Sequence, residues 1–369
     1  MNIVWYSEVK WNYLRTRKQN LLTHFPLNDR ILFFQPFSFV KRNYFFPRKE
    51  GDIYYLTLPT YRKSSYKFID TLMSFHIFRK IFYKFVKWYA NAWIIILLKK
   101  RPDCICISNI YYLPLINNIK SPVIWDFNDH PGQFGEIPIW ANQEFTEFLI
   151  DKNNTIISSS IGITNYLKNK YERSAYTIPN GVDLAKFDKK ISKNDLNQKP
   201  VIGYVGIISS WFFDFELVKQ VATHLSLYEI HLYGPCVSDV KEQLDEILRI
   251  SNISYFGEKP YDMLPKVMET FTVGIIPLYS IPEVWRLASG KFLQYLGIGI
   301  PVVSVWMDQY SKIKNNVFLA KTHSEFIDSL EKALKHSFIP MADELKGYDW
   351  RYLSIEFRNE LEAAIESFS

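Results

Sequence analysis

Short runs of β-branched and aromatic residues alternate with helical patterns along almost the whole chain. The strands expected in the first half are residues 3–6, 30–35, 53–58, 103–108, 123–127, 155–159 and 175–178. Those expected in the second half are residues 201–206, 230–233, 253–256, 273–277 and 301–305. Repeated strand–helix–strand units build parallel sheets with right-handed crossovers. We therefore expect an α/β protein of two Rossmann-like, doubly wound domains that face each other across a cleft.

A polar segment, residues 184–199, separates the two series of strands and is the expected linker. It divides an N-terminal domain, residues 1–183, from a C-terminal domain, residues 200–348. The last amphipathic segment, residues 349–369, is long enough to pack back across both domains. A chain of 369 residues is large enough for two cores of this size.

Composition excludes several classes of protein. Hydrophobic residues make up 48% and charged residues 22% of the chain, which is typical of a globular protein rather than a disordered one. No run reaches the ~18 uninterrupted apolar residues of a membrane-spanning helix, and the first ten residues lack the pattern of a signal peptide. Three cysteines cannot form a disulfide framework, so a reducing cytoplasm is expected.

Basic charge is concentrated in the first half. Residues 1–180 carry 24 basic and 13 acidic residues, whereas the remainder carries 20 basic and 25 acidic ones. The excess is sharpest in residues 61–101, where lysines flank apolar residues at helical spacing. This pattern fits a helix with a solvated basic back, but it also fits a helix on an anionic membrane surface, which we prefer. Nucleic acid is not expected as a partner, since no binding motif accompanies the charge.

Residues 177–187 read Thr-Ile-Pro-Asn-Gly-Val-Asp-Leu-Ala-Lys-Phe. Taken alone, they predict an ordinary turn, because Asn180 and Gly181 tolerate a positive φ after Pro179. Further along, residues 202–206 read Ile-Gly-Tyr-Val-Gly and place a glycine at the end of a strand, where the backbone can approach a phosphate.

These segments together resemble the family-4 glycosyltransferases. The Trp-Phe-x-Asp pattern at residues 211–214 is similar to the variant in bacterial transferases that build cell-surface polysaccharides such as teichuronic acid. The resemblance covers nearly the whole chain and is strongest in residues 177–305. It implies the GT-B fold, with an acceptor bound by the first domain and a nucleotide sugar bound by the second.

A second glycine-rich segment begins at Ser289, a good N-cap. Gly290 and Lys291 open the helix that follows, so its N-terminus and the ammonium can hold a diphosphate. Gln294 lies one turn deeper, where the family usually has a glutamate that binds the ribose hydroxyls. The candidate donor-binding residues are Gly206, Ile207, Ser209, Gly234, Arg286, Ser289, Gly290, Lys291 and Gln294.

Two departures from the family keep other functions open. The family often has a second glutamate eight positions before the ribose residue, where this chain has Arg286. The Arg and Lys that many members place after the first turn are absent from residues 207–213. A non-catalytic GT-B scaffold subunit, or a nucleotide-sugar epimerase or phosphorylase on the same fold, therefore stays an alternative.

In the first domain, the strand-like run 123–127 has Asp126 near its end and is followed by Asp129 and His130. Carboxylate and imidazole groups at the carboxyl end of a strand are placed for general acid–base work, although an aspartate here also suits a loop cap. We expect a carboxylate to orient or deprotonate the acceptor hydroxyl and His130 to contact the donor sugar. The candidate acceptor or membrane contacts are Arg15, Arg17, Lys80, Lys84, Lys87 and Trp88.

The sequence therefore predicts a glycosyltransferase of hexosyltransferase type that uses a UDP- or GDP-linked sugar. The acceptor would be a hydroxyl of a lipid-linked or polysaccharide chain, at the inner face of a bacterial cell membrane. No cofactor and no metal are expected, since no cluster has metal-ligand spacing. The resemblance implies retention at the anomeric carbon, although the aspartates would equally serve an inverting attack.

Overall fold

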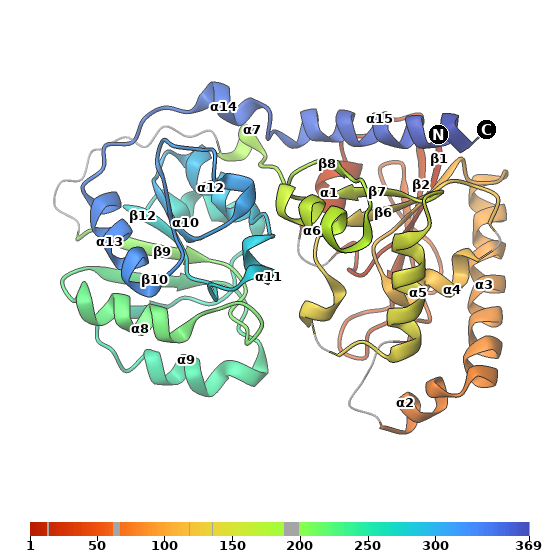
Figure 1. The fold of residues 1–369 in the computed structure, drawn as a ribbon, viewed down its shortest axis with the longest axis horizontal. Coiled ribbons are helices and arrows are strands. Elements are labelled where there is room, and N and C mark those ends of the chain that lie inside the picture. Colours follow the sequence, from red (N-terminus) through yellow and green to blue (C-terminus); the bar gives the residue numbers. More distant parts are fainter. Residues whose placement is uncertain (13–14, 62–66, 118, 135, 188–198, 369) are drawn as a thin grey trace. The chain divides into compact units, whose positions relative to one another are not determined.

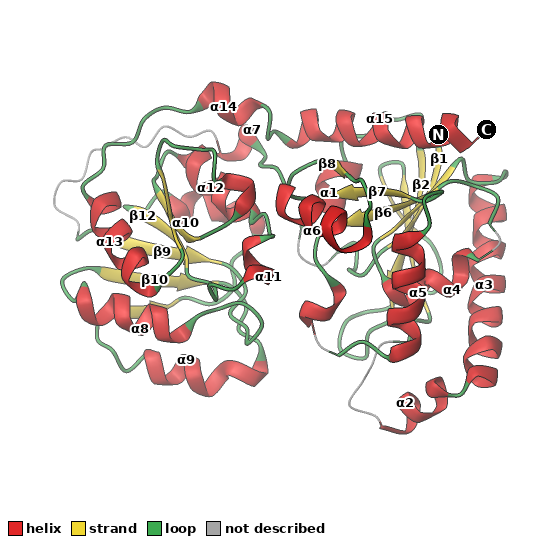
Figure 2. Cartoon of the chain, in the orientation of Figure 1, coloured by secondary structure: helices red, strands yellow, loops and turns green. Residues whose placement is uncertain are grey.

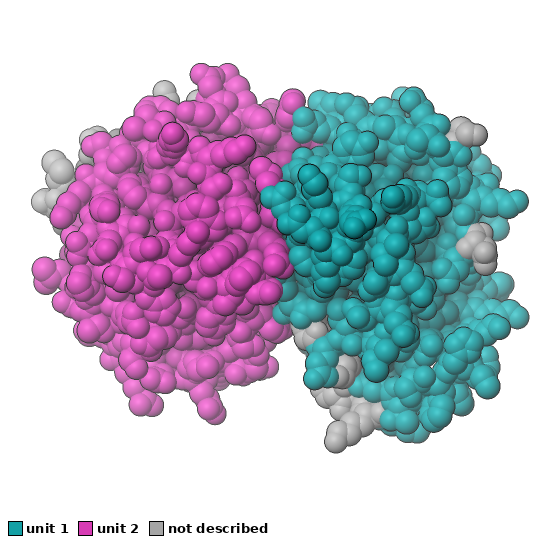
Figure 3. Space-filling view, in the orientation of Figure 1, with its two compact units in different colours: residues 1–159, 163–178, 354–369 teal, residues 160–162, 179–353 magenta. Residues whose placement is uncertain are grey.

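The computed structural model describes residues 1–369 except 13–14, 62–66, 118, 135, 188–198 and 369. The chain forms two compact units (Figure 3). Unit 1 contains Met1–Ser159, Ile163–Ile178 and Ser354–Ser369, and unit 2 contains Ser160–Gly162 and Pro179–Leu353. Of the expected linker, Leu184–Phe187 form the short helix α7, and residues 188–198 lie outside the described residues.

Unit 1 is built on an eight-stranded sheet in the order β3-β4-β2-β1-β5-β6-β7-β8 (Figure 1). Its strands are β1 (Asn2–Tyr6), β2 (Arg30–Pro36), β3 (Arg48–Glu50), β4 (Ile53–Leu58), β5 (Cys104–Ile107), β6 (Val123–Phe127), β7 (Thr155–Ser158) and β8 (Tyr176–Thr177). All neighbours are parallel except β3 and β4. The winding direction reverses between β1 and β5, so this is the point where an open sheet of this kind binds ligands.

Helices cover both faces of this sheet. They are α1 (Arg17–Leu22), α2 (Lys67–Ser74), α3 (His76–Leu98), η1 (Ile110–Tyr112), α4 (Leu113–Ile116), η2 (Pro131–Phe134), α5 (Ile139–Ile150), α6 (Ile161–Tyr171) and α15 (Trp350–Phe368). Buried side chains of α3, α4 and α5 share a core with Val4 and Leu32. On the other face, Phe357 of α15 stacks on Trp5 of β1, with ring centroids 5.7 Å apart.

Unit 2 has a six-stranded parallel sheet in the order β11-β10-β9-β12-β13-β14. Its strands are β9 (Val201–Val205), β10 (Glu229–Tyr233), β11 (Ile253–Tyr255), β12 (Val273–Ile276), β13 (Val302–Val305) and β14 (Val317–Ala320). Its helices after α7 are α8 (Phe215–His224), η3 (Ser238–Val240), α9 (Lys241–Ile247), η4 (Tyr261–Met263), α10 (Leu264–Met268), α11 (Pro282–Trp285), α12 (Gly290–Ile298), η5 (Asp308–Tyr310), α13 (His323–Leu334) and α14 (Ala342–Lys346). This strand order is that of dinucleotide-binding sheets, with the reversal between β9 and β12.

The alternating pattern of the sequence therefore predicted both parallel sheets, and Figure 2 shows the strands of each unit between its helices. Two strands, β3 and β14, were not predicted. All three residues of β3 are charged and exposed, so they lack the apolar signal of a buried strand. Three of the four residues of β14 are only partly buried, as suits the edge of a sheet.

Candidate active site

In unit 2, two glycines meet at the carboxyl ends of β9 and β10. Gly234 has a φ of +133°, and a Cβ there would lie 1.8 Å from the carbonyl oxygen of Gly206. The backbone N–H of Gly206 in turn donates to the carbonyl of Tyr233 at 2.9 Å. Only a residue without a side chain allows so close an approach of two turns. The two glycines therefore allow the turns after β9 and β10 to pack against each other at the edge where a phosphate is expected.

The loop that follows Gly206 is held by the Tyr204 side chain and by pairing with the segment after β10. The Tyr204 hydroxyl donates to the carbonyl of Ile207 at 2.9 Å, and Ile208 forms a bridge with Cys236 beyond β10. Ser209 is completely buried, and within the described residues its hydroxyl has no hydrogen-bond partner. A buried hydroxyl without a partner is costly, so Ser209 is a group that a ligand or water can satisfy.

The aspartate of the Trp-Phe-x-Asp pattern has a structural position. Asp214 caps α8 by accepting a 2.9 Å hydrogen bond from the N–H of Leu217. Its second oxygen lies 2.8 Å from Nε2 of His323 at the start of α13. Asp214 therefore fixes the helix that follows the β9 loop and joins it to a neighbouring helix.

The Asn-Gly pair of the turn motif positions the start of α12. Nδ2 of Asn180 donates to the carbonyl of Ala288 at 2.8 Å. A Cβ at Gly181 would lie 2.6 Å from the carbonyl oxygen of Tyr348, so this site accepts only glycine. The hydroxyl of Tyr310 donates to the carbonyl of Ser289 at 2.9 Å, which fixes the N-cap from the other side. The Ser289 side chain does not cap the helix itself.

Lys291 and Gln294 lie together on the first turn of α12. Nζ of Lys291 is 3.2 Å from Oε1 of Gln294, whose side chain is almost fully buried. Burial lowers the pKa of Lys291 to about 8, and no ion pair joins its ammonium to a carboxylate of the described residues. A desolvated ammonium without a counter-ion at the positive end of a helix favours an incoming anion.

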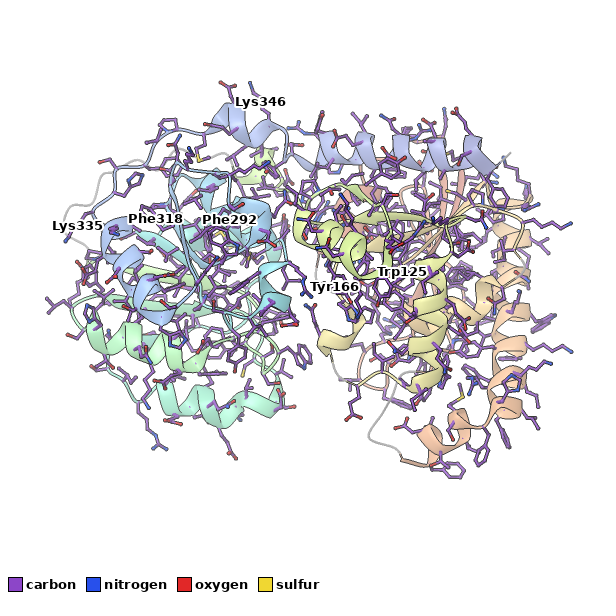
Figure 4. The ribbon with its side chains drawn as sticks, in the orientation of Figure 1. Trp125, Tyr166, Phe292, Phe318, Lys335 and Lys346 are labelled. Atoms are coloured by element: carbon purple, nitrogen blue, oxygen red, sulfur yellow. The ribbon has the colours of Figure 1, made fainter. Side chains whose placement is uncertain are left out.

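Tyr295 ties this helix to the central strand. Its hydroxyl accepts a 2.8 Å hydrogen bond from the N–H of Val205, the last residue of β9. Its ring lies on Gly274 of β12, where a Cβ would be 2.5 Å from Cγ of the tyrosine. On the same helix Phe292, labelled in Figure 4, stacks on Tyr310 with ring centroids 4.0 Å apart. The predicted donor residues therefore gather at the switch point of the unit 2 sheet.

Arg286, which replaces the expected glutamate, ends α11 and is partly buried. Its backbone carbonyl accepts a hydrogen bond from the hydroxyl of Ser160. Its carbonyl is therefore fixed within unit 2, a few residues before the N-cap of α12.

In unit 1, buried charges meet at the carboxyl ends of the central strands. Nε of Arg17 donates to Oδ1 of Asp126 at 2.9 Å, and neither side chain is more than 2% exposed. Nζ of Lys18 lies 2.6 Å from Oε1 of Glu8 and 3.7 Å from Oδ2 of Asp126. The other oxygen of Glu8 accepts from the hydroxyl of Ser108. Because Glu8 follows β1 and Ser108 follows β5, this network lies at the switch point of the unit 1 sheet.

Asp129 and His130 follow the end of β6, and Asp129 is influenced by the charges of this network. Burial raises the pKa of Asp129 to about 6; the charges of Glu8 and Asp126 act in the same direction, and that of Lys18 opposes them. Nδ1 of His130 accepts a 3.1 Å hydrogen bond from the N–H of Gly132, which leaves the neutral ring's proton on Nε2. The ring packs on Tyr166, labelled in Figure 4, with centroids 5.9 Å apart.

Of the two arginines among the candidate acceptor contacts, Arg17 is buried and paired with Asp126, whereas Arg15 is exposed. Asp126 is buried by the same contact, so Asp129 is the better placed of the two aspartates for an acceptor. Glu8 and Lys18 were not predicted. Glu8 lies two residues beyond β1, and Lys18 is next to Arg17 in the sequence. These positions indicate a shared site only when the strand order is known.

The residues expected to touch a membrane lie on α3. Lys80, Lys84 and Trp88 are exposed. Lys87 is partly buried, and its ammonium donates to the carbonyl of Asn117 at 2.6 Å.

Comparisons with known proteins identify the fold. Among solved structures, HepE of Anabaena in complex with UDP and glucose has a TM-score of 0.66 and 13% identity, over 98% of this chain and 99% of HepE. The sucrose-phosphate synthase of Thermosynechococcus elongatus has a TM-score of 0.66 and 13% identity, over 100% and 96%. The lipopolysaccharide outer core galactosyltransferase WaaB has a TM-score of 0.62 and 14% identity, over 100% and 99%. The chain has the GT-B fold.

The sequence comparisons match a smaller part of the chain than the structural comparisons do. No protein-family model matches it. It is 25% identical over 168 residues to the "Putative teichuronic acid biosynthesis glycosyltransferase TuaH" of Bacillus subtilis (strain 168). The match covers 43% of this chain and 42% of TuaH, so it spans less than half of that relative. The predicted GT-B fold and the resemblance to the teichuronic-acid-type transferases are thus confirmed.

Proposed function

We propose that this protein is a glycosyltransferase that moves a hexosyl group from a nucleoside diphosphate sugar to an acceptor hydroxyl. The observation that carries the proposal is the first turn of α12. The partly buried ammonium of Lys291 lies there beside Gln294, with no carboxylate partner among the described residues, on a helix whose N-cap is fixed by Tyr310. These groups suit a diphosphate and the ribose next to it.

The leaving group explains why this charge matters. In the reaction, the acceptor oxygen bonds to the anomeric carbon while the bond from that carbon to the diphosphate oxygen breaks. The nucleoside diphosphate leaves with the electron pair, and the acceptor proton passes to a base. Lys291 and the positive end of the α12 dipole would stabilise the negative charge that develops on the diphosphate. We propose that this cation makes a bound metal and other cofactors unnecessary.

Unit 1 would supply the acceptor site. Asp129 has a pKa of about 6, so above this pH it is a carboxylate able to orient or deprotonate an acceptor hydroxyl. His130 carries its neutral-form proton on Nε2 and can donate it to a hydroxyl of the donor sugar. The Arg17–Asp126 pair would position this segment without touching substrate.

The finer assignments rest on resemblance. HepE is described in complex with UDP and glucose, which supports a UDP-linked donor here. The partial match to TuaH, whose name places it in teichuronic acid biosynthesis, supports a role in polysaccharide synthesis. We further propose a lipid-linked or polysaccharide acceptor and a reaction at the cytoplasmic face of a bacterial membrane. Retention at the anomeric carbon is the outcome that the family resemblance implies.

A donor-hydrolysis assay tests the proposal. The protein is incubated with UDP-, GDP- and dTDP-sugars, and released nucleoside diphosphate is measured. One donor should be hydrolysed slowly, and Lys291→Met should reduce its release by ~10²-fold. The control is Lys312→Met, an exposed lysine after η5, which should release nucleotide at the unaltered rate. Undiminished release in Lys291→Met would remove this residue from the mechanism.

The replacement of the family's glutamate by Gln294 favours a second candidate, a non-catalytic GT-B subunit that only binds nucleotide. A thermal-shift measurement with UDP separates the two. A ligand at ~100 times its dissociation constant adds ~2.7 kcal/mol of stability. Stabilisation by UDP together with no release from any nucleotide sugar would favour the scaffold over the transferase.

A further inference from the structure

Helix α3 is apolar on two opposite faces. Its inner face is buried in the core of unit 1 through Tyr83, Val86, Ala90, Ile94 and Leu98. Its outer face carries apolar side chains that are more than half exposed, and these are Phe75 at the N-cap and Ile77, Phe78, Ile81, Phe85, Trp88, Ile95 and Ile96. Single exposed apolar residues are normal, but a continuous stripe along one helix marks an interaction surface.

Helix geometry places this outer stripe opposite the core. Successive residues turn by about 100°, so Ile77, Ile81 and Trp88 lie within a narrow sector of the helix. The buried residues Val86 and Ala90 point the other way. Trp88 is 65% exposed, although indole rings are rarely left in water without a partner. We call the exposed apolar residues of α2, α3 and the loop 39–46 the outer surface.

The neighbouring loop continues the outer surface. The ring centroids of Phe46 and Trp93 of α3 are 6.1 Å apart, and the hydroxyl of Tyr89 donates to the carbonyl of Phe45. The loop therefore lies against α3, and its exposed apolar residues are Phe39, Val40, Phe45 and Phe46. On the N-terminal side, α2 adds the exposed Phe68. Three separate segments of unit 1 thus expose apolar groups around one helix.

Positive charge borders the outer surface. Within α3 there are four basic residues and no acidic one. Lys80 and Lys84 are exposed along one edge of the apolar stripe, and the loop adds Lys41 and Arg42, also exposed. Lysines beside an apolar stripe can extend their ammonium groups to lipid phosphates while their stems stay on the apolar surface. The charge pattern is complementary to an anionic bilayer.

We propose that the outer surface binds the face of an anionic lipid bilayer, with α3 lying in the interface. The helix spans 23 residues and is apolar enough to cross a membrane by length and composition. Its inner residues, however, are part of the unit 1 core, and a spanning helix would have to leave that core. An interfacial helix keeps the core intact and covers the outer apolar residues. The surface would hold unit 1 beside a lipid-linked acceptor.

Vesicle flotation of the full chain tests this proposal. Vesicles of phosphatidylcholine alone are compared with vesicles that contain equal parts of phosphatidylglycerol. The protein should float with the anionic vesicles and less with the neutral ones, and salt should weaken the binding. Lys80→Gln with Lys84→Gln should weaken binding by roughly fivefold for each lysine removed. Ile81→Ser with Phe85→Ser and Trp88→Ser should abolish flotation.

Matched variants on unit 2 control for charge and apolarity. Lys312→Gln with Lys314→Gln removes two exposed lysines, and Leu227→Ser removes an exposed apolar residue. Both should float as the unaltered protein does. The substituted α3 residues are exposed, so the α3 variants should keep the melting temperature and the donor hydrolysis of the unaltered protein. A loss of flotation in these variants would then report a loss of membrane binding and not of folding or activity.

Three results would overturn the proposal. The first is equal flotation with neutral and anionic vesicles, or equal flotation of the α3 variants and the unaltered chain. The second is a dimer in light scattering that the α3 variants dissociate, since a second copy would then cover the outer surface. The third is resistance of the bound protein to alkaline carbonate, which extracts peripheral proteins and would leave a membrane-spanning α3 in place.

Discussion

Nε of Arg17 donates to Oδ1 of Asp126 across 2.9 Å, in the interior of unit 1. The two residues are 109 positions apart and join α1 to the end of β6. Lys18 approaches the same carboxylate, and the face of Phe357 lies 5.7 Å from the guanidinium. The charge of Asp126 is therefore neutralised by α1, and the loop that carries Asp129 begins from a fixed strand end.

Removal of one partner of this pair should destabilise unit 1. Arg17→Gln leaves the Asp126 carboxylate buried with Lys18 alone, and a broken buried ion pair costs about 3 kcal/mol or more. Urea unfolding measures the change. Arg17→Met combined with Asp126→Leu should recover part of the loss, because no unpaired charge stays buried. Lys346→Gln, which breaks the exposed pair with Asp343, serves as the control and should have no measurable effect.

Lys291→Met should stabilise the free protein at pH 7 while it weakens donor binding. The folded pKa of about 8 lies below the ordinary 10.5, so the unfolded chain binds the proton more tightly. Stability of the unaltered protein should therefore rise between pH 8 and pH 10.5, and that of the variant should lack this rise. Melting curves with and without UDP at several pH values measure both effects. UDP binding that persists undiminished well above pH 8 would argue against an ammonium at the diphosphate.

Asp129→Asn should separate stability from activity. The folded pKa of about 6 lies above the ordinary 3.8, so the folded protein binds the proton more tightly than the unfolded chain. Stability should fall as the pH rises from about 4 to 6, and the variant should lack this contribution and be the more stable protein at pH 7. Glycosyl transfer should fall by ~10²-fold or more in the variant.

The matched control for this prediction is Asp328→Asn, an exposed residue of α13. It should change neither the transfer rate nor the slope of stability against pH. A transfer rate in Asp129→Asn equal to that of the control would show that the base lies elsewhere.

Gly234→Ala should be among the most harmful single changes in unit 2. The new Cβ would lie 1.8 Å from the carbonyl oxygen of Gly206, at a φ of +133° that alanine rarely adopts. We expect a loss of about 3 kcal/mol or more in urea unfolding. At Gly347 the φ is −66° and nothing lies within 4 Å of a Cβ, so Gly347→Ala should change stability by less than ~1 kcal/mol. Similar losses in the two variants would contradict the close approach of the β9 and β10 turns.

The fold could be predicted because its signal is local. Each buried strand, such as Ile53–Leu58, is an apolar run bounded by turn residues, and alternation with helices is visible without knowledge of contacts. The start of α12 was also predictable, since Ser289, Gly290 and Lys291 are consecutive and lie at one helix end. The role of Asn180 was not, because its bond to Ala288 joins positions 108 apart.

The unit 1 network was harder to predict for the same physical reason. Glu8 and Ser108 are in contact only because β1 and β5 are neighbours in the sheet. Local sequence patterns do not determine the order of the strands. The burial of Arg17 could not be predicted from the sequence, because arginine is usually exposed. Its burial depends on Asp126 and on Phe357, which come from distant parts of the chain.

The route of α15 has a consequence for biosynthesis. Unit 1 starts at Met1, yet Ser354–Ser369 also belong to it, and the Trp5–Phe357 stack and the Arg358–Asp29 ion pair join the two ends of the chain. A ribosome releases these last residues only after all of unit 2 has emerged. The sheet face that carries Trp5 therefore stays exposed until the end of translation. Unit 2, in contrast, needs no residue beyond Leu353. Premature termination directly after Leu353 would leave unit 2 complete but expose this apolar face of unit 1 to aggregation.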